Sequence, residues 1–221
     1  MKRLPFSCLL VLFLLSGCAS LKAKSEVFEN TFYSSYPEIM IKVSSEFEYV
    51  GETSEAEMRR AQDSSYTGNV QKNWYIFVQS DKERVKKAVS IKIQRAPTYF
   101  VSDIYGRVKN YHDRGTLKLG GASWQYCSVS KNVSMSGIVT RFATEHGYVL
   151  PNCSLYKEFG KVLGAKNNYL ITIAYLDFPP TSDYACHFWK PNSDLAYSQR
   201  EYIEQFKKDA EASFKVLKIS H

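Results

Sequence analysis

The first eighteen residues constrain this chain more than any other part of its sequence. Two basic residues open the chain, an unbroken apolar run follows at residues 9–15, and two small residues precede Cys18. This order is typical of a secretory signal, and the run is too short to span a bilayer as a stable helix. We therefore predict that residues 1–17 are removed on export. That leaves 204 of the 221 residues to fold in a compartment that permits disulfides.

The tetrapeptide Leu15-Ser16-Gly17-Cys18 resembles the lipobox of bacterial lipoproteins. In that family the Cys thiol receives a diacylglyceryl group, the lipoprotein signal peptidase cuts before it, and the new amine is often acylated. The resemblance implies that Cys18 is lipidated, and two or three acyl chains such as palmitate give stable anchoring. Ala19 and Ser20 follow in place of the Asp that commonly retains lipoproteins in the inner membrane. The resemblance thus implies attachment to the outer membrane, facing the periplasm, if the organism has one.

Composition predicts one globular domain after a short tether. Apolar residues make up 44% of the chain and charged residues 23%, which are ordinary values for a folded protein. We assign residues 18–29 to the lipidated Cys and its tether, and residues 30–221 to a single domain. The formal charge of +7 falls to +5 once Lys2 and Arg3 leave, and no dense Lys/Arg run is present. These features disfavour nucleic acid and leave the membrane surface or an envelope protein as partners.

Alternating apolar residues predict six to eight mostly antiparallel strands. The predicted strands are residues 39–49, 74–78, 89–93, 115–119, 123–129, 137–142, 155–162 and 169–178. The first bends near Ser44-Ser45 and 137–142 stands alone, while the other six form three consecutive strand pairs. Gly120-Gly121 and the Gly/Asn-rich stretch 164–168 supply turns for two of these pairs.

Two helices complete the predicted fold. Ser54 and Glu57 have capping-box spacing, which predicts a short helix at residues 53–63. A second capping box, Ser198 with Glu201, precedes an apolar stripe at helical spacing. That stripe consists of Ile203, Phe206, Ala210, Phe214 and Leu217. The sum is an α+β fold, in which a mostly antiparallel sheet is packed by a long C-terminal helix.

The closing segment resembles that of PsbP-like domains. The resemblance rests on the strand-like run 169–175, a helix through Phe206 and the run 213–216. PsbP-like domains are α-β-α sandwiches and mostly binding or accessory proteins, so the resemblance implies a domain without catalysis. Residues 111–146 do not match that family's pattern.

Three cysteines besides Cys18 lie in the predicted domain, so at most one internal disulfide can form. Cys153 precedes one strand of the last hairpin and Cys186 follows the partner strand, which favours a Cys153–Cys186 bond. The pairings Cys127–Cys153 and Cys127–Cys186 remain open. Cys127 lies inside a predicted strand, where a buried thiol is expected.

No pattern in the chain predicts a metal or a cofactor. Cys153, Cys186, His146 and His187 could supply zinc ligands, but structural zinc sites usually have close pairs such as Cys-x-x-Cys. No such pair is present. We therefore expect neither a metal nor another cofactor.

A catalytic centre is equally unsupported. A Cys127 nucleophile would need a His that the fold brings close, and Asp103, Asp113 and Glu145 stand in no defining pattern. Gly-x-Ser-x-Gly, P-loop and dinucleotide motifs are absent. The sequence does not settle whether the chain is an enzyme, although it favours a non-catalytic role.

Aromatic residues are the remaining candidates for a ligand site, because aromatic walls with a few polar groups are typical of pockets. Those that gather in the sequence are Tyr99, Phe100, Tyr105, Tyr111, Trp124, Tyr126, Tyr184, Phe188 and Trp189. The leading hypothesis is a lipid-anchored envelope lipoprotein that acts as a non-catalytic binding or accessory domain. The alternatives are a cell-envelope hydrolase and a small-molecule carrier.

Overall fold

A computed structural model describes residues 24–60, 67–96, 110–134, 137–164, 168–180, 186–191 and 193–220. Over these residues the chain has eleven strands, two α-helices and one short 3-10 helix. The strands are β1 (Ser25–Phe28), β2 (Thr31–Ser35), β3 (Glu38–Val43), β4 (Glu48–Arg60), β5 (Thr67–Asp81), β6 (Arg84–Arg95), β7 (Asp113–Leu119), β8 (Ala122–Asn132), β9 (Cys153–Leu163), β10 (Tyr169–Asp177) and β11 (Phe214–Ile219). The helices are α1 (Ile138–Glu145), η2 (Cys186–Trp189) and α2 (Tyr197–Ala212).

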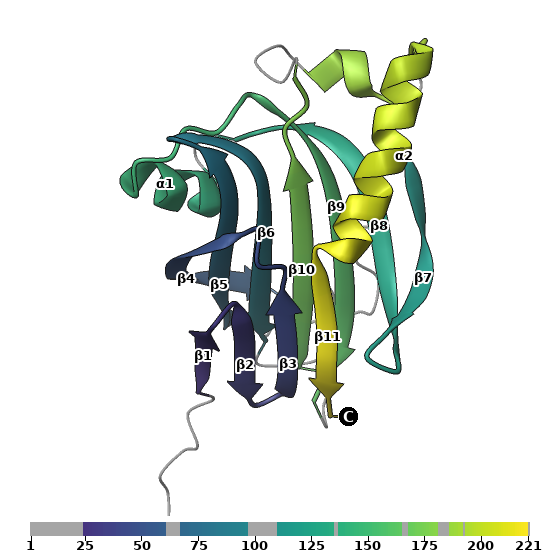
Figure 1. The fold of residues 1–221 in the computed structure, drawn as a ribbon. Helices are drawn as coiled ribbons and strands as arrows, with labels where there is room; N and C mark the ends of the chain where they lie inside the picture. The colour runs from purple at the N-terminus through teal and green to yellow at the C-terminus, as the bar shows by residue number, and fades with distance from the viewer. Residues whose placement is uncertain are drawn as a thin grey trace, which may run out of the picture.

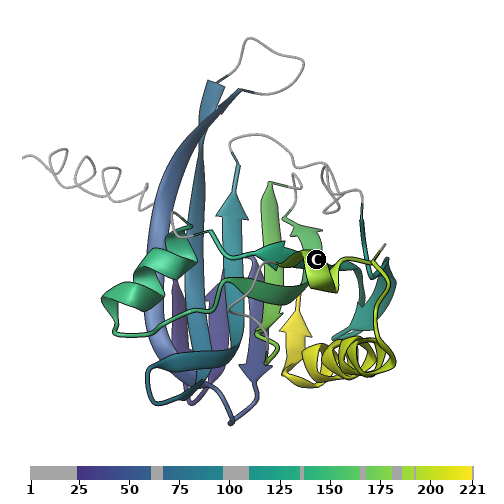
Figure 2. The ribbon, with the colours of Figure 1, turned by 90° about the horizontal axis from the view of Figure 1, so that it is seen from above.

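The strands form two antiparallel sheets. The large sheet has the order β4-β5-β6-β10-β9-β8-β7, and the small sheet has the order β1-β2-β3-β11. In Figure 1 the small sheet lies at the lower end of the molecule and α2 stands above it, continuous with β11. The β4–β5 hairpin projects beyond the other strands of the large sheet (Figure 2). Part of the predicted tether, residues 25–28, is strand β1.

The chain passes from the small sheet to the large sheet between β3 and β4. The alternation at residues 39–49 therefore covers two strands in different sheets, where one bent strand was predicted. The Asn30 side-chain amide holds this corner, because it donates to the carbonyl oxygens of Ser44 at 3.2 Å and Phe47 at 2.6 Å. Phe47 is buried in the core.

The three predicted strand pairs are present as β5–β6, β7–β8 and β9–β10. Their turns use positive φ angles, which are costly for most side chains. Gly120 and Gly121 have φ angles of 57° and 81°, and Gly164 has 90°. Local alternation and turn chemistry were therefore enough to predict these hairpins.

The predicted helix at residues 53–63 is wrong, because residues 48–60 form β4. Its residues pair with β5 along the strand's length, from Glu48 opposite Val78 to Arg60 opposite Thr67. Residues two apart in a strand share a face. Glu55 and Glu57 therefore both contact the Lys72 ammonium, at 2.7 and 2.5 Å.

The predicted strand at 137–142 is also wrong, because residues 138–145 form α1. Gly137 is its extended N-cap residue and makes no side-chain capping bond. Thr140, Phe142 and Ala143 are buried against the large sheet. The β-branched start of this segment suggested a strand, but tertiary packing outweighs that weak preference.

The fold class predicted from the sequence is wrong, because the molecule is mostly β and has no long C-terminal helix. Helix α2 has 16 residues and ends at Ala212, where Ser213 donates its hydroxyl to the Ala210 carbonyl. Phe214 belongs to β11, which pairs with β3 and buries Phe214 and Val216. Gln199 accepts the Ala196 N–H at the start of α2, in place of the predicted Ser198–Glu201 box.

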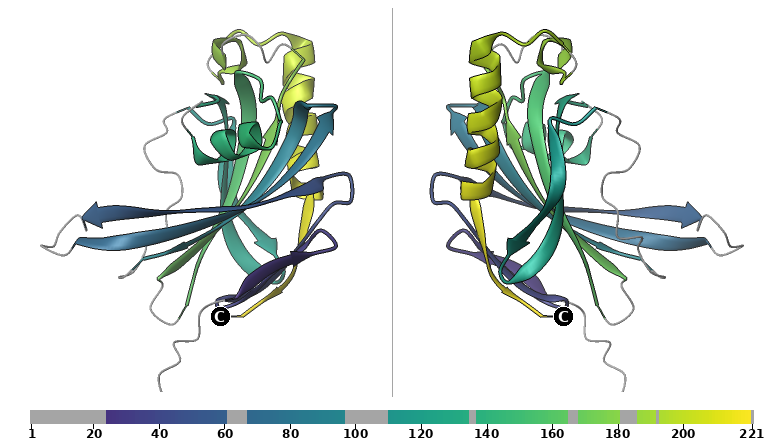
Figure 3. Two further views of the ribbon diagram at one scale, coloured as in Figure 1. Left: turned by 90° about the vertical axis from the view of Figure 1, so that its left-hand side faces the viewer. Right: turned by 90° about the vertical axis from the view of Figure 1, so that its right-hand side faces the viewer.

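The two faces of the large sheet carry separate hydrophobic cores. One face packs against the small sheet and α2, and its core includes Phe32, Trp124 and Phe206. The other face packs against α1, and its smaller core includes Trp74, Phe142 and Leu176. Figure 3 shows α1 and α2 on opposite sides of this sheet. Every residue of both cores lies at Val27 or beyond.

Within the described ranges no helix is long and apolar enough to cross a membrane.

Candidate binding cleft

The small sheet leaves one end of the large sheet uncovered, and an open cleft of about 860 Å³ lies there. Its floor comes from β4, β5, β6 and β10, and its rim comes from the start of β1 and the β2–β3 turn. The lining residues are Lys24, Ser25, Tyr36, Glu52, Thr53, Ser54, Gln71, Asn73, Tyr75, Ile93, Arg95 and Tyr169. Aromatic, amide, hydroxyl and charged groups dominate this set, which is typical of a surface that recognises polar ligands.

Three tyrosines form the aromatic part of the cleft. Tyr36 is 48% exposed on the rim, and its ring meets Tyr169 edge to face with 5.1 Å between centroids. Tyr75 is buried and packs on Phe32 at 4.6 Å. Burial raises the pKa of both Tyr75 and Tyr169, so both phenols stay protonated at neutral pH. Each can therefore offer a hydroxyl to a ligand.

Charged groups of both signs face the cleft. The Arg95 guanidinium lies 5.9 Å from the Tyr169 ring centroid, and no carboxylate among the described residues pairs with it. Glu52 raises the pKa of Tyr75 further, and Ser25 lowers it. Lys24 pairs with Glu26 at 3.1 Å, where both side chains are well exposed. A guanidinium that pairs with no described carboxylate can bind a carboxylate or similar anion.

A strand edge borders the cleft. Among the described strands β1 pairs only with β2, so one side of its backbone has no sheet partner. Lys24 and Ser25, at the start of β1, line the cleft. An open edge of this kind can accept an extended polypeptide as an added strand.

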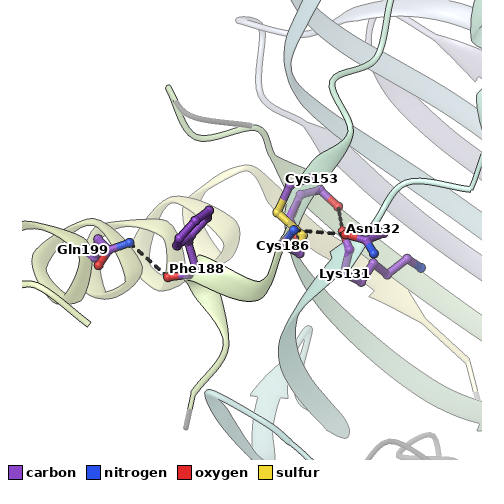
Figure 4. The surroundings of a disulfide bond; sticks show 7 residues. Lys131, Asn132, Cys153, Cys186, Phe188 and Gln199 are labelled. Atoms are coloured by element: carbon purple, nitrogen blue, oxygen red, sulfur yellow. Dashed lines mark hydrogen bonds between the residues drawn. A yellow bond between two sulfur atoms is a disulfide. The ribbon is translucent and has the colours of Figure 1, made fainter. Parts of the chain in front are cut away.

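The cysteine pairing favoured by the sequence is the one that the structure forms. Cys153 and Cys186 are joined with an S–S distance of 1.99 Å (Figure 4). Asn132 on β8 accepts the Cys186 N–H at 3.1 Å, and Gln199 on α2 donates to the Phe188 carbonyl at 3.0 Å. The disulfide thus ties η2 to the start of β9, away from the cleft. Cys127 is buried in β8 and takes no part in it.

The histidines and cysteines considered for zinc do not converge. Cys153 and Cys186 are bonded to each other, and His146 stacks on Phe142 at the end of α1. His187 is exposed on η2. No group of three potential metal ligands occurs among the residues that the structure describes.

Of the carboxylates considered for catalysis, Asp113 has the richest surroundings. It accepts the Ser128 hydroxyl and lies 3.8 Å from the Lys157 ammonium, which pairs with Glu211 of α2 at 2.8 Å. Burial raises the Asp113 pKa, while Lys157 opposes the shift. Ser128 and Lys157 are almost fully buried, so this cluster holds α2 on the sheet. Glu145 is exposed at the end of α1, and Asp103 lies outside the described residues.

The aromatic residues predicted to line a cleft do not line this one. Tyr111, Trp124, Tyr126, Phe188 and Trp189 lie elsewhere, and Trp124 and Trp189 are buried in the core. Tyr99, Phe100, Tyr105 and Tyr184 lie outside the described residues.

The cleft residues that the sequence reasoning missed come from distant elements. Tyr36, Tyr75, Arg95 and Tyr169 lie on the β2–β3 turn, β5, β6 and β10. The one local signal is that Tyr36, Arg95 and Tyr169 lie in a turn or at a strand end, whereas Tyr75 lies in the middle of β5. That signal does not specify which strand ends meet.

Comparison with known proteins adds no relative, because no family model, curated protein or solved structure matches this chain. The lipobox and the PsbP-like resemblance therefore stay predictions from the sequence.

Proposed function

We propose that this chain is a lipid-anchored envelope protein whose folded domain binds an extended segment of an envelope partner, without chemistry of its own. The cleft carries this proposal. Within the part of the chain that the structure describes, it combines an open strand edge at β1, three tyrosines and the Arg95 guanidinium without an ion-pair partner. Main-chain bonds to a strand edge supply affinity, and side-chain pockets beside the edge supply specificity. A partner segment with a carboxylate near Arg95 fits this chemistry.

The predicted anchor would hold the cleft close to the membrane. Lys24, on the rim, is six residues after Cys18. Six residues span at most about 20 Å even when fully extended. The partner segment would therefore belong to a protein in, or close to, the same membrane.

Lipidation is tested by metabolic labelling. In the producing bacterium, or a close relative, the wild-type chain should incorporate labelled palmitate and sediment with membranes. Cys18→Ser should lose the label and leave the membrane fraction, whereas Cys8→Ser, inside the predicted signal, should keep both. Equal labelling and equal sedimentation of the two variants would contradict the predicted lipidation of Cys18.

Binding in the cleft is tested by site-specific photocrosslinking in whole cells. A benzophenone amino acid placed at Tyr36, on the rim, should give one discrete crosslinked product. The matched position is Tyr197, which is 76% exposed at the start of α2 and lies outside the cleft. Crosslinking of equal strength from both positions, or none from Tyr36, would overturn the proposal.

A further inference from the structure

A second pocket lies on the opposite face of the large sheet, beneath the start of α1. Its volume is about 250 Å³, and five neighbouring strands, β5, β6, β10, β9 and β8, supply its floor. The roof consists of residues 137–140 at the start of α1, Val133 and Ser134 before them, and Leu150. An apolar cavity of about 150 Å³ is enough to hold benzene, so this pocket has room for a small organic molecule.

The walls of this pocket combine apolar and polar groups. Trp74, Leu176, Ile138 and Leu150 supply an apolar surface. Ser90 and Thr172 line the floor, with only 7% and 3% of each residue exposed. Neither hydroxyl has a hydrogen-bond partner among the described residues. Neither oxygen is among the fully buried side-chain atoms that lack a partner, so both hydroxyls reach the open pocket, where a ligand with hydrogen-bonding atoms can meet them.

Lys131, from β8, brings a positive charge to the same pocket. Its ammonium lies 4.1 Å from the Tyr156 ring centroid and forms no ion pair with a described carboxylate. Lys92, also in the lining, differs because its ammonium lies 3.8 Å from Glu158. Burial lowers the Lys131 pKa, and the nearby Glu158 carboxylate only partly opposes this shift.

The start of α1 adds a second attraction for an anion. Gly137 makes no side-chain capping bond, and the first turn contains no acidic residue. The first N–H groups of a helix lack intrahelical partners, and the helix dipole is positive at this end. Gly137, Ile138, Val139 and Thr140 all line the pocket. A helix start whose N-cap residue has no capping side chain and an ammonium without an ion pair to a described carboxylate therefore meet one cavity.

We propose that this pocket binds a small organic acid, whose carboxylate lies between Lys131 and the start of α1. Its apolar body packs against Trp74 and Leu176, and Ser90 and Thr172 donate hydrogen bonds from the floor. The proposal concerns a ligand and a face of the sheet different from those of the cleft. Either proposal can fail without the other.

Titration of the domain from Ser20 onward tests this proposal, because that fragment contains every residue of both cores. The probes are octanoate and 3-phenylpropionate, with octanol as the uncharged comparison. The readout is the indole N–H NMR signal of Trp74, while Trp124 and Trp189, on the other face, serve as internal controls. At least one acid should shift the Trp74 signal with a Kd of about 1 mM or below.

Two variants test the role of the charge. Lys131→Met should weaken acid binding at least about tenfold, to the level of octanol, because it removes only the ammonium. Lys118→Met, an exposed change on β7, should leave the affinity unchanged. Binding of octanoate alone or phenylpropionate alone supports the proposal and identifies the body of the ligand. The proposal is overturned if neither acid binds, if octanol binds as tightly, or if Lys131→Met binds like wild type.

Discussion

The two faces of the seven-stranded sheet differ in what they bury. The face toward the small sheet and α2 carries the large apolar core, and its charged groups, such as Lys157 with Glu211, are paired. The face toward α1 has a smaller core and, beside it, a pocket lined by hydroxyls and by the Lys131 ammonium, which forms no ion pair with a described carboxylate. Apolar burial supplies most folding free energy, and polar groups that line an open pocket can bind a ligand. The first face is therefore the main source of stability, and binding chemistry lies at its uncovered end and on the second face.

The largest expected effect compares one Phe from each face. Phe206→Ala on α2 removes a ring that is 1% exposed and stacks on Tyr175, and should cost about 3–5 kcal/mol. The melting temperature should fall by roughly 10 °C. Phe142→Ala on α1 should cost at most about 2 kcal/mol, because its ring packs at the edge of the smaller core. Thermal and urea unfolding measure the stability of both variants. Equal losses of unfolding free energy would contradict the predicted difference between the two faces.

The next effect concerns the disulfide, which belongs to the first face. Cys153 and Cys186 are 33 residues apart, so their bond restricts a loop of moderate length in the unfolded chain. Cys153→Ala with Cys186→Ala should lower the free energy of unfolding by about 3 kcal/mol. Cys127→Ala, on the α1 face, should cost about 1 kcal/mol. A double variant as stable as wild type would show that this bond adds little to the stability of the fold.

The smallest effect is a pH dependence from His112, which lies against α2 and η2. Burial lowers its pKa to about 4, from 6.5, and its Nε2 atom is buried without a hydrogen-bond partner. The unfolded chain therefore binds the proton more readily than the folded chain. The stability linked to this ring is complete above pH 6.5 and is lost as pH falls toward 4, by about 2 kcal/mol.

Urea unfolding between pH 7 and pH 4 measures this dependence. His112→Gln removes the titrating ring, so its stability should fall less over that interval than that of the wild type. Asp113 and Asp177 shift in the opposite sense, since burial raises their pKa and favours the folded chain at low pH. Parallel wild-type and variant profiles would rule out a contribution from His112.

The sequence was informative where structure is local. Alternation and turn residues predicted the β5–β6, β7–β8 and β9–β10 pairs, and the hairpin positions favoured the Cys153–Cys186 bond over the other two pairings. Alternation failed at residues 39–49, because one continuous pattern serves two sheets. The Asn30 contacts that hold the intervening corner depend on the packed fold.

The errors at residues 53–63 and at the C-terminus share a cause. Ser54 and Glu57 fit a helix cap as well as an alternating strand, and only the partner strand β5 decides between the two. Phe214 continues a helical stripe, but its pairing with Val43 places it in the small sheet. Strand pairing between residues so far apart has no local signature. The cleft was missed for the same reason, because its residues meet only after both sheets have formed.

The most direct test of the account separates binding in the cleft from the stability of the core. Arg95→Glu reverses the charge of an exposed cleft residue, and Lys118→Glu makes the same change on β7, outside the cleft. With the photocrosslinker at Tyr36, the account predicts that Arg95→Glu lowers the crosslinking yield at least about fivefold. Its melting temperature should stay within about 2 °C of wild type, and Lys118→Glu should change neither quantity. Equal yields from the two variants, or a loss that only accompanies unfolding, would contradict the account.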